Sequence, residues 1–353
     1  MSGRRKLQCL AAAVGSAAIL GCMTEGSEKS SDAAIDATGS IEVLADGSTG
    51  LVGEISALAL SESGMLFVTD RITSAVHVFD TLGRHVRTIG KKGQGPGEFL
   101  GPRGLAIVDS SIVVIDEGNA RLQTLSAEGR PLASRPLPPA PQGGHWSIRS
   151  DGLIARPTLG LDSALAKVSD SEGGGEIRIG TPAGTPSQEV NPRAVKRDLV
   201  EGRIPDIFLN TARPVLGAGS IVWLILPARA VVEAYNAAGV RTDSVLLTEP
   251  EYDVVRAEVM AANAALPGFK MRPPEFIYDG QCDGRSLWAL TATGSQGAAH
   301  LLRIQLDSGV VQTLTLPAVV GARKFALDLK RGWAYFGTED LTALVRTRLN
   351  AGG

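Results

Sequence analysis

The chain has 353 residues, of which 35 are basic and 37 acidic, so its net charge at pH 7 is −2. A nearly neutral chain without a basic stripe is not expected to bind nucleic acid. Two of the three cysteines, Cys9 and Cys22, lie at the very start, which leaves Cys282 without a partner for an intramolecular disulfide. Stability must therefore come from a large apolar core.

The first segment carries basic residues at positions 4–6, followed by an uncharged apolar run over 7–21. That run is too short and too rich in small residues for a membrane span, and it is typical of a secretory signal peptide. Its end, Ile-Leu-Gly-Cys, resembles a bacterial lipobox, in which cleavage before the cysteine leaves a lipid-bearing thiol. We predict a signal peptide over 1–21 and lipidation of Cys22. The alternative is an ordinary signal peptide with an incidental cysteine.

The segment 22–40 is rich in Ser, Ala, Gly and charge, which predicts a flexible tether. Without the signal peptide the chain has 32 basic and 37 acidic residues, so it is mildly acidic. Met23 stands where lipoproteins retained at the inner membrane carry an Asp. The resemblance therefore favours a lipid-anchored protein of the bacterial envelope at the outer membrane, which contacts the membrane through its anchor alone.

Two segments, 64–84 and 110–130, superpose without a gap at an offset of 46 residues. The matched pairs are Val68 with Val114, Asp70 with Asp116, Gly83 with Gly129, and Arg84 with Arg130. Each copy reads as strand, hairpin, strand, hairpin, which is the unit of a four-stranded meander. A repeat of this length and content predicts a β-propeller rather than a sandwich.

Four weaker copies follow, and their starts are Asp151, Gly219, Gly284 and Arg331. The last provides three strands and ends at Leu349, while the segment 39–45 lacks a partner. Pairing that segment with the last copy would close the ring and remove an exposed edge. We therefore predict an all-β, six-bladed propeller of four-stranded antiparallel blades over 41–353, with its folded part beginning near Ile41.

The stretch KKGQGPGEFLGP, residues 91–102, poses a choice between a phosphate cradle and a crossing between blades. It resembles the NHL repeat, and the matching residues are Gly90, Gly93, Gly97, Glu98, Phe99, Pro102, Gly104, Asp116, Asn119 and Arg121. A phosphate loop would continue with Gly-Lys-Ser/Thr and open a helix, which this stretch does not. We favour a structural role, in which glycines supply positive φ and Phe99 is buried between blades.

The NHL resemblance is specific over 55–130 and looser elsewhere. The wider layout, including the Asp-Gly-Arg-x-Leu-Trp motif within 266–290, resembles bacterial six-bladed propellers, many of them lipoproteins. Two insertions interrupt the period, over 181–212 and 248–276. The polar, proline-interrupted stretch 181–206 is expected to be a solvated loop.

The second insertion predicts one helix over 248–268. Thr248 and Glu251 form a capping box, and Pro267 with Gly268 ends the helix. A shared face is expected for Tyr252, Val255, Val259 and Leu266. We favour a helix packed on the rim; the alternative is a lid over one mouth of the channel.

The candidate chemical groups are few. The four histidines, His77, His85, His145 and His300, show no metal-ligand spacing, and His77 is expected to point outward on an outer strand. Asp70 and Asp116 occupy equivalent turn positions, where they either close the turn through backbone N–H groups or offer oxygens to Ca²⁺. We therefore assign no catalytic, cofactor or metal residue, and leave a channel Ca²⁺ open.

Two functions remain. The favoured one is a non-catalytic, lipid-anchored scaffold that binds a protein, peptide or glycan. The alternative, implied by resemblance of architecture, is a metal-dependent hydrolase or lyase of the lactonase or streptogramin-lyase type. A cluster of inward Asp, Glu, Asn or His side chains near one point of the axis would favour the enzyme.

Overall fold

The computed structural model describes residues 35–36, 40–108, 110–138, 145–149, 153–158, 164–169, 175–184, 191–219, 221–247, 251–268, 270–284, 286–291, 298–305, 311–338 and 342–351. The predicted signal peptide, Cys22 and most of the tether lie outside these residues. Within them, no helix has both the length and the apolar character needed to cross a membrane.

The described residues form six four-stranded antiparallel sheets. The first holds β3 (Ile55–Leu60), β4 (Leu66–Asp70), β5 (Ala75–Phe79) and β6 (His85–Ile89). The second holds β7 (Pro102–Val108), β8 (Ser111–Asp116), β9 (Arg121–Ser126) and β10 (Pro131–Pro136). The third holds β11 (Ser147–Ile148), β12 (Ile154–Pro157), β13 (Ala166–Ser169) and β14 (Ile177–Ile179).

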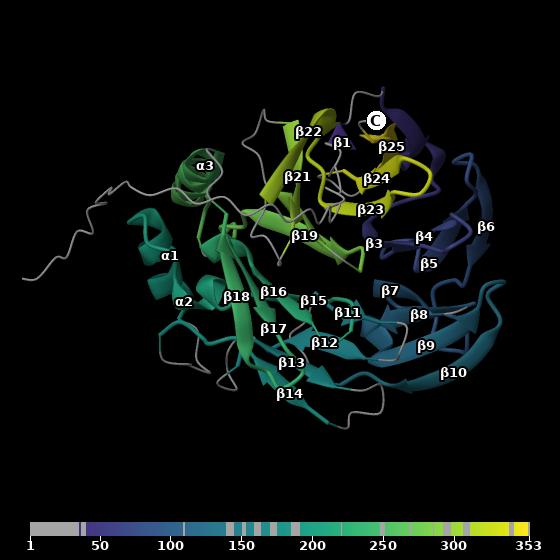
Figure 1. Cartoon of the computed structure of the whole chain (residues 1–353), viewed down its shortest axis with the longest axis horizontal. Helices are drawn as coiled ribbons and strands as arrows, with labels where there is room; N and C mark the ends of the chain where they lie inside the picture. Colours follow the sequence, from purple (N-terminus) through teal and green to yellow (C-terminus); the bar gives the residue numbers. More distant parts are fainter. Residues whose placement is uncertain are drawn as a thin grey trace, which may run out of the picture. The chain divides into compact units, whose positions relative to one another are not determined.

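The fourth sheet holds β15 (Arg213–Leu216), β16 (Val222–Leu226), β17 (Val231–Tyr235) and β18 (Arg241–Leu246). The fifth holds β19 (Ile277–Cys282), β20 (Leu287–Thr291), β21 (Ala298–Ile304) and β22 (Val311–Val320). The sixth holds β23 (Lys324–Asp328), β24 (Trp333–Gly337), β25 (Leu344–Arg348) and β2 (Glu42–Ala45). Figure 1 shows the sheets arranged around one axis, so the predicted six-bladed propeller is confirmed.

The ring is closed by the predicted N-terminal strand. β2 pairs antiparallel with β25, with Glu42 opposite Arg346, and is the outermost strand of the sixth blade. Arg346 Nη2 lies 2.8 Å from Glu42 Oε2, and Ala45 is buried in the core cluster of that blade. The sixth blade therefore combines strands from both ends of the chain.

A short pairing precedes this closure. β1 (Ile35–Asp36) pairs antiparallel with β26 (Asn350–Ala351), so regular structure begins before the expected start at Ile41. The two residues of β1 fall in the segment predicted to be a tether. Backbone pairing needs no apolar side chain, which is why the composition of this segment did not indicate it.

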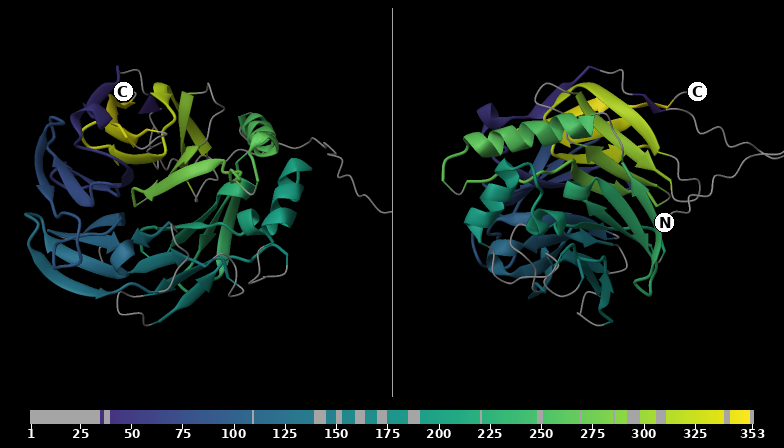
Figure 2. Two further views of the ribbon diagram at one scale, coloured as in Figure 1. Left: turned by 180° about the vertical axis from the view of Figure 1, so that it is seen from behind. Right: turned by 90° about the vertical axis from the view of Figure 1, so that its left-hand side faces the viewer.

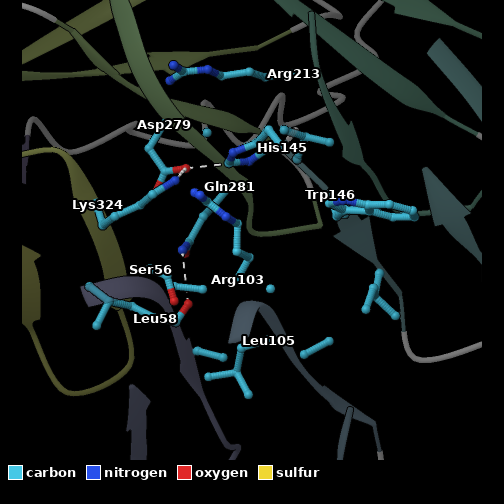
Figure 3. Close-up of a pocket in the computed structure, with 18 of the residues that line it drawn as sticks. Ser56, Leu58, Arg103, Leu105, His145, Trp146, Arg213, Asp279, Gln281 and Lys324 are labelled. Carbon is cyan, nitrogen blue, oxygen red and sulfur yellow. Dashed lines mark hydrogen bonds and ion pairs between the residues drawn. The ribbon is translucent and has the colours of Figure 1, made fainter. Parts of the chain in front are cut away.

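In each blade the first strand lies nearest the axis, and the following strands lie further out in order. The first strands line a central cavity, seen from close by in Figure 3. Because the fourth strand of a blade runs antiparallel to the first, it ends on the face where the next blade begins. All connections between blades, and all turns between second and third strands, therefore lie on one face, which we call the crossing face.

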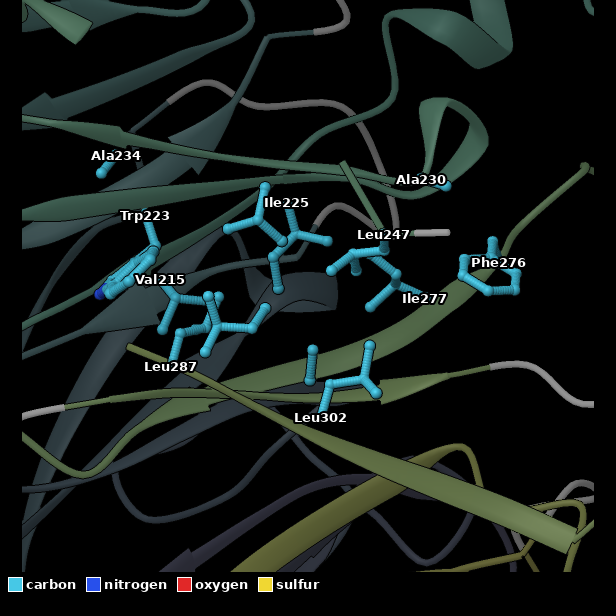
Figure 4. Packing of buried hydrophobic residues seen from close by; sticks show 13 residues of the cluster. Val215, Trp223, Ile225, Ala230, Ala234, Leu247, Phe276, Ile277, Leu287 and Leu302 are labelled. Carbon is cyan, nitrogen blue, oxygen red and sulfur yellow. The ribbon is translucent and has the colours of Figure 1, made fainter. Parts of the chain in front are cut away.

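The core lies between neighbouring blades. Second strands are buried on both sides, as every residue of β4, β16 and β20 shows, and they read as continuous apolar runs. Outer strands such as β18 alternate between exposed and half-buried residues. Between the fourth and fifth blades, Trp223, Ile225 and Leu302 are among the buried side chains that interlock (Figure 4). This packing fixes the angle between blades, and hence the positions of the strands that line the axis.

Two insertions place helices on the crossing face. α1 (Pro192–Val200) and α2 (Asp206–Leu209) lie between the third and fourth blades, and α3 (Glu251–Ala265) lies between the fourth and fifth. Figure 2 shows the three helices gathered at one place on the rim. Single 3₁₀ turns are η1 (Gly47–Thr49), η2 (Glu117–Asn119) and η3 (Pro227–Arg229).

The expectation of a solvated loop over 181–206 is wrong where α1 forms. Asn191 caps this helix by accepting hydrogen bonds from the N–H groups of Arg193 and Ala194. Val195 and Leu199, one turn apart, are buried. The basic residues of the segment had suggested solvation, but Arg193 and Arg197 lie on the exposed face of an amphipathic helix and Lys196 packs against α3.

α3 packs on the rim through the predicted face. Val255 and Val259 are buried and pack against Tyr278, and the Tyr252 ring meets Phe276 edge-on at 4.9 Å between centroids. Lys196 of α1 donates hydrogen bonds to carbonyl oxygens at the end of α3, where cations are favoured. The contacts support packing rather than a free lid; the expected cap at Thr248 lies outside the described residues.

Candidate functional site

The central cavity has a volume of about 610 Å³ and is lined by residues from all six blades. This size falls in the range of about 300–1,000 Å³ typical of small-molecule sites. Because each blade contributes its first strand, residues far apart in the chain meet at the axis. The cavity is the described feature best placed to hold a ligand.

The lining is polar at one end and apolar at the other. Ionic side chains stand at or next to the start of first strands, and they include Glu54, Arg103, Arg213 and Lys324. Further along these strands the lining is mainly apolar, with Leu58, Leu60, Leu105, Ile107 and Leu216. One polar side chain, Gln281 of β19, reaches this region, where its Nε2 lies 3.4 Å from the Leu58 carbonyl oxygen. Since the first strands begin at the crossing face, the polar end is the mouth on that face.

Asp279 stands at the centre of the polar end (Figure 3). Its side chain is 6% exposed, and its Oδ1 lies 3.5 Å from both His145 Nε2 and Lys324 Nζ. Its Oδ2 accepts a hydrogen bond of 3.3 Å from the N–H of Phe325. A register shift in β19 between Ile277 and Asp279 accompanies this placement, as bulges often re-aim a side chain.

Arg213 lies beside Asp279, His145 and Lys324, and one of its N–H groups has no acceptor among the described residues. Its Nη2 is 2.9 Å from Glu275 Oε2, while its Nη1 is buried and has no hydrogen-bond partner among the described residues. The indole Nε1 of Trp146, which also lines the cavity, is buried without a partner within the same described ranges. We call Asp279, His145, Lys324, Arg213 and Trp146 the mouth cluster.

The electrostatics of the mouth cluster keep His145 neutral. Burial lowers the pKa of this imidazole well below its ordinary value, and the charges of Lys324 and Arg213 lower it further. Neutral His145 is then able to donate one N–H toward Asp279 without adding charge. The mouth cluster has two cations, Arg213 and Lys324, each already facing one carboxylate.

The predicted motif residues Asp70 and Asp116 lie outside the cavity lining and organise the backbone. Asp70 is fully buried and accepts hydrogen bonds from the N–H groups of Gly53, Glu54 and Thr73, at 2.6, 2.9 and 2.7 Å. Asp116 accepts one of 2.7 Å from the N–H of Leu100. Each carboxylate thus joins a turn to the preceding crossing, which is the backbone alternative rather than the Ca²⁺ alternative.

The glycine-rich crossing over 91–102 uses its backbone groups internally. Arg121 donates to the carbonyl oxygens of Gln94, Gly95 and Glu98, each within 2.9 Å. The N–H of Gly97 donates to Gln123 Oε1 at 3.0 Å. These contacts describe an inter-blade crossing, with its backbone turned toward protein rather than toward an anion.

Phe99, Gly93 and Pro102 also sit in this crossing. Phe99 has no exposed surface and packs in the core between the first two blades. Gly90 has φ +79°, and a Cβ there would lie 2.3 Å from Phe99 Cε2. Gly93 accepts a hydrogen bond from Asn119 through its carbonyl, and Pro102 begins β7.

His77 does not point outward, so that expectation is wrong. It is 3% exposed, with Nε2 3.0 Å from Thr73 Oγ1 and Nδ1 3.1 Å from Thr88 Oγ1. Every residue of β5, the third strand of its blade, is buried, so both faces of this strand are covered. Simple alternation fails for such a strand.

Metal and thiol chemistry find little support in the part of the chain that the structure describes. No three His, Cys, Asp or Glu side chains come together there in a way that could hold a metal ion. Cys282 lines the cavity, but burial raises the pKa of its thiol above the ordinary value. A thiol of raised pKa is a poor nucleophile at neutral pH.

Sequence reasoning missed most of the mouth cluster. Arg213, Asp279 and Lys324 belong to three different blades and carry no local motif. A signal was present: Arg103, Arg213 and Lys324 each occupy the first or second position of a first strand. Aligning the weaker repeats on those positions would have predicted that basic residues from three blades lie near the axis.

Comparison with known proteins agrees with the architecture. A family model described as a six-bladed β-propeller matches residues 44–141. No match was found among curated proteins. A Bacteroides fragilis protein predicted to be exported has a similar structure, with a TM-score of 0.56 and 13% identity, over 93% of this chain and 98% of that one.

Two further structures are similar. A DUF4221 family member from Bacteroides vulgatus gives a TM-score of 0.52 at 10% identity, covering 91% of this chain and 99% of that one. A streptogramin B lyase gives a TM-score of 0.50 at 14% identity, covering 88% and 98%. At such identities these likenesses show the fold alone.

Proposed function

We propose that this chain is a lipid-anchored protein of the bacterial envelope that binds a ligand at the polar mouth without transforming it. The observation that carries the proposal is the state of the carboxylates that line the cavity. Glu54 pairs with Arg71, Glu275 with Arg213, and Asp279 with Lys324. Carboxylates held in such pairs serve recognition better than nucleophilic or general-base chemistry, which needs an available carboxylate.

The envelope location rests on the predicted signal peptide and on Cys22. The similarity to a protein predicted to be exported supports it. A protein, peptide or glycan end is the class of ligand that an exported scaffold of this size would meet. The crossing face, with its helices and long connections, would present the mouth to that ligand.

A channel-blocking variant tests the binding role. Leu58→Trp would fill the apolar end of the cavity, whereas Val86→Trp adds the same ring on the exposed outer strand β6. Because Leu58 also packs in a buried core cluster, the melting temperatures of both variants are compared with that of the unmodified protein. Ligands enriched from an envelope extract by the unmodified protein and by Val86→Trp should be lost with Leu58→Trp. Equal enrichment by both variants would place binding elsewhere.

The alternative, a metal-dependent hydrolase or lyase, is favoured by one observation, the approach of neutral His145 to Asp279. A base of this kind beside a carboxylate is a recurrent arrangement in acid–base catalysis. Mass spectrometry of the dialysed protein tests it. About one tightly held Ca²⁺ or Zn²⁺ per chain, with chelator-sensitive turnover of an ester or lactone, would replace the binding role by this one.

A further inference from the structure

We propose that the mouth cluster binds the carboxylate of its ligand, and that the apolar body of that ligand extends along the first strands. This inference rests on the binding role proposed above and names the chemistry of the ligand. It follows from the balance of hydrogen-bond donors and acceptors at the polar end, and from the change of lining along the cavity.

Donors exceed acceptors at the polar end. Arg213 Nη1 and Trp146 Nε1 are buried, and neither meets an acceptor in the described chain. Lys324 has three N–H donors, and its contact with Asp279 is long, at 3.5 Å. A buried donor without an acceptor costs free energy, so a ligand that supplies acceptor oxygens would relieve that cost.

The acceptors at the polar end are already occupied. Asp279 receives His145, Lys324 and the N–H of Phe325, and Glu275 receives Arg213. A ligand cation would have to compete for these carboxylates. An anion would instead share Arg213 and Lys324, and a guanidinium has a second edge with which to hold a carboxylate.

Charge alone does not select the ligand, because the two cations face two carboxylates. The ligand is selected by where the polar groups lie. Figure 3 shows Lys324, Asp279 and His145 converging at the polar end, with Arg213 beside them. Leu58 and Leu105 also line the cavity, further along β3 and β7 than the ionic residues at the start of these strands. A carboxylate at the mouth with an apolar body below it satisfies both regions at once.

Two sources share this chemistry, a short acyl chain and the C-terminal end of an apolar peptide. Two matched pairs of probes separate them: octanoate with octan-1-ol, and N-acetyl-Leu-Leu as free acid with its C-terminal amide. Isothermal titration calorimetry gives the four affinities. It uses the complete chain, purified without its lipid as the Cys22→Ala variant. In at least one pair the acid should bind about tenfold or more tightly than its neutral partner, which corresponds to about 1.4 kcal/mol. The pair with the tighter acid identifies the source.

Variants assign the contact to the mouth cluster. Arg213→Gln should weaken the preferred acid by about tenfold and leave its neutral partner within about twofold. Arg103→Gln is the matched control, because Arg103 lines the same cavity but its Nε is bound to Glu117 at 2.6 Å. Trp146→Phe keeps an aromatic side chain and removes the indole N–H donor, so it should weaken the acid even if Arg213→Gln fails to fold.

The outcomes separate this inference from the binding role. If acids and neutral partners bind equally, the carboxylate inference is overturned while a ligand-binding cavity stands. If none of the four probes binds, the inference is overturned too, and the extract experiment with Leu58→Trp judges the binding role independently. If Arg103→Gln weakens the acid as much as Arg213→Gln, general charge rather than the mouth cluster is responsible, which also overturns it.

Discussion

Asp116 shows how a single buried carboxylate organises the second blade. It has no exposed surface, and it accepts hydrogen bonds from the N–H of Leu100 and from the side chains of Asn119, Arg121 and Gln123. Its removal would leave Arg121, whose side chain is 17% exposed, without its anion. The turn, the crossing and the ninth strand therefore depend on one side chain.

We predict that Asp116→Ala lowers the free energy of unfolding by about 3–5 kcal/mol, the usual cost of breaking a buried ion pair from one side. Urea unfolding followed by circular dichroism measures it. Asp80→Ala is the control: Asp80 also caps a turn, through Leu82 and Arg84, but in an exposed hairpin. A loss no larger than that of the control would contradict the role assigned to Asp116.

His145 makes stability depend on pH. Its pKa is lowered in the folded protein, first by burial, so the unfolded chain binds more protons once the pH falls below the ordinary imidazole value of about 6.5. The free energy of unfolding should therefore fall as the pH is lowered from about 7 to about 5. Since carboxylates also titrate there, the informative quantity is the difference from His145→Gln, which should lose less. If the free energy of unfolding falls equally with pH in both proteins, the role assigned to His145 is wrong.

At the scale of elements, the closing strand β2 is the clearest test of the ring. Deleting residues through Ala45 removes the strand β2, which pairs with β25. It also removes the buried Ala45 side chain and the carboxylate of Glu42 that pairs with Arg346. Deleting residues through Ser40 removes only the two-residue pairing of β1. We predict a clear drop in melting temperature for the first deletion and a small one for the second; equal melting temperatures would contradict closure by β2.

Helices α1 and α3 are joined by one ammonium group. Lys196 Nζ lies 3.1 Å from the carbonyl oxygens of both Leu266 and Lys270, near the C-terminal end of α3. We predict that Lys196→Met speeds amide hydrogen exchange in α3, because those carbonyls lose their donor. Arg197→Gln, which alters a neighbouring exposed side chain, should leave the exchange unchanged.

These elements also show what a sequence can and cannot predict. The repeats at Asp70 and Asp116 predicted strands and turns because each blade is built locally. β2 was predicted because the segment 39–45 had no partner and the last blade lacked one strand. α1 was missed although Asn191 and Pro192 form a helix start, because the charged residues of this segment were taken to indicate a solvated loop. The mouth cluster was missed because its residues meet only when the ring closes.

At the scale of the whole molecule, the proposed attachment to the membrane depends on Cys22, which lies outside the described residues. Cys22→Ala should leave an unlipidated protein that no longer partitions into detergent with the membrane fraction, since its thiol is the proposed acceptor of lipid. Cys9→Ala is the matched control, because Cys9 lies within the predicted signal peptide. If Cys22→Ala still partitions with the membrane, the anchor is wrongly assigned.

The pairing of β2 with β25 also governs when this protein can fold during its synthesis. Glu42 leaves the ribosome 304 residues before its partner Arg346. The sixth blade cannot be completed until nearly the whole chain has been made, and such distant contacts slow folding. Until then the ring stays open and its inner strands stay exposed. For the export that we propose, this order of folding would let the chain pass through a translocation pore before its ring closes.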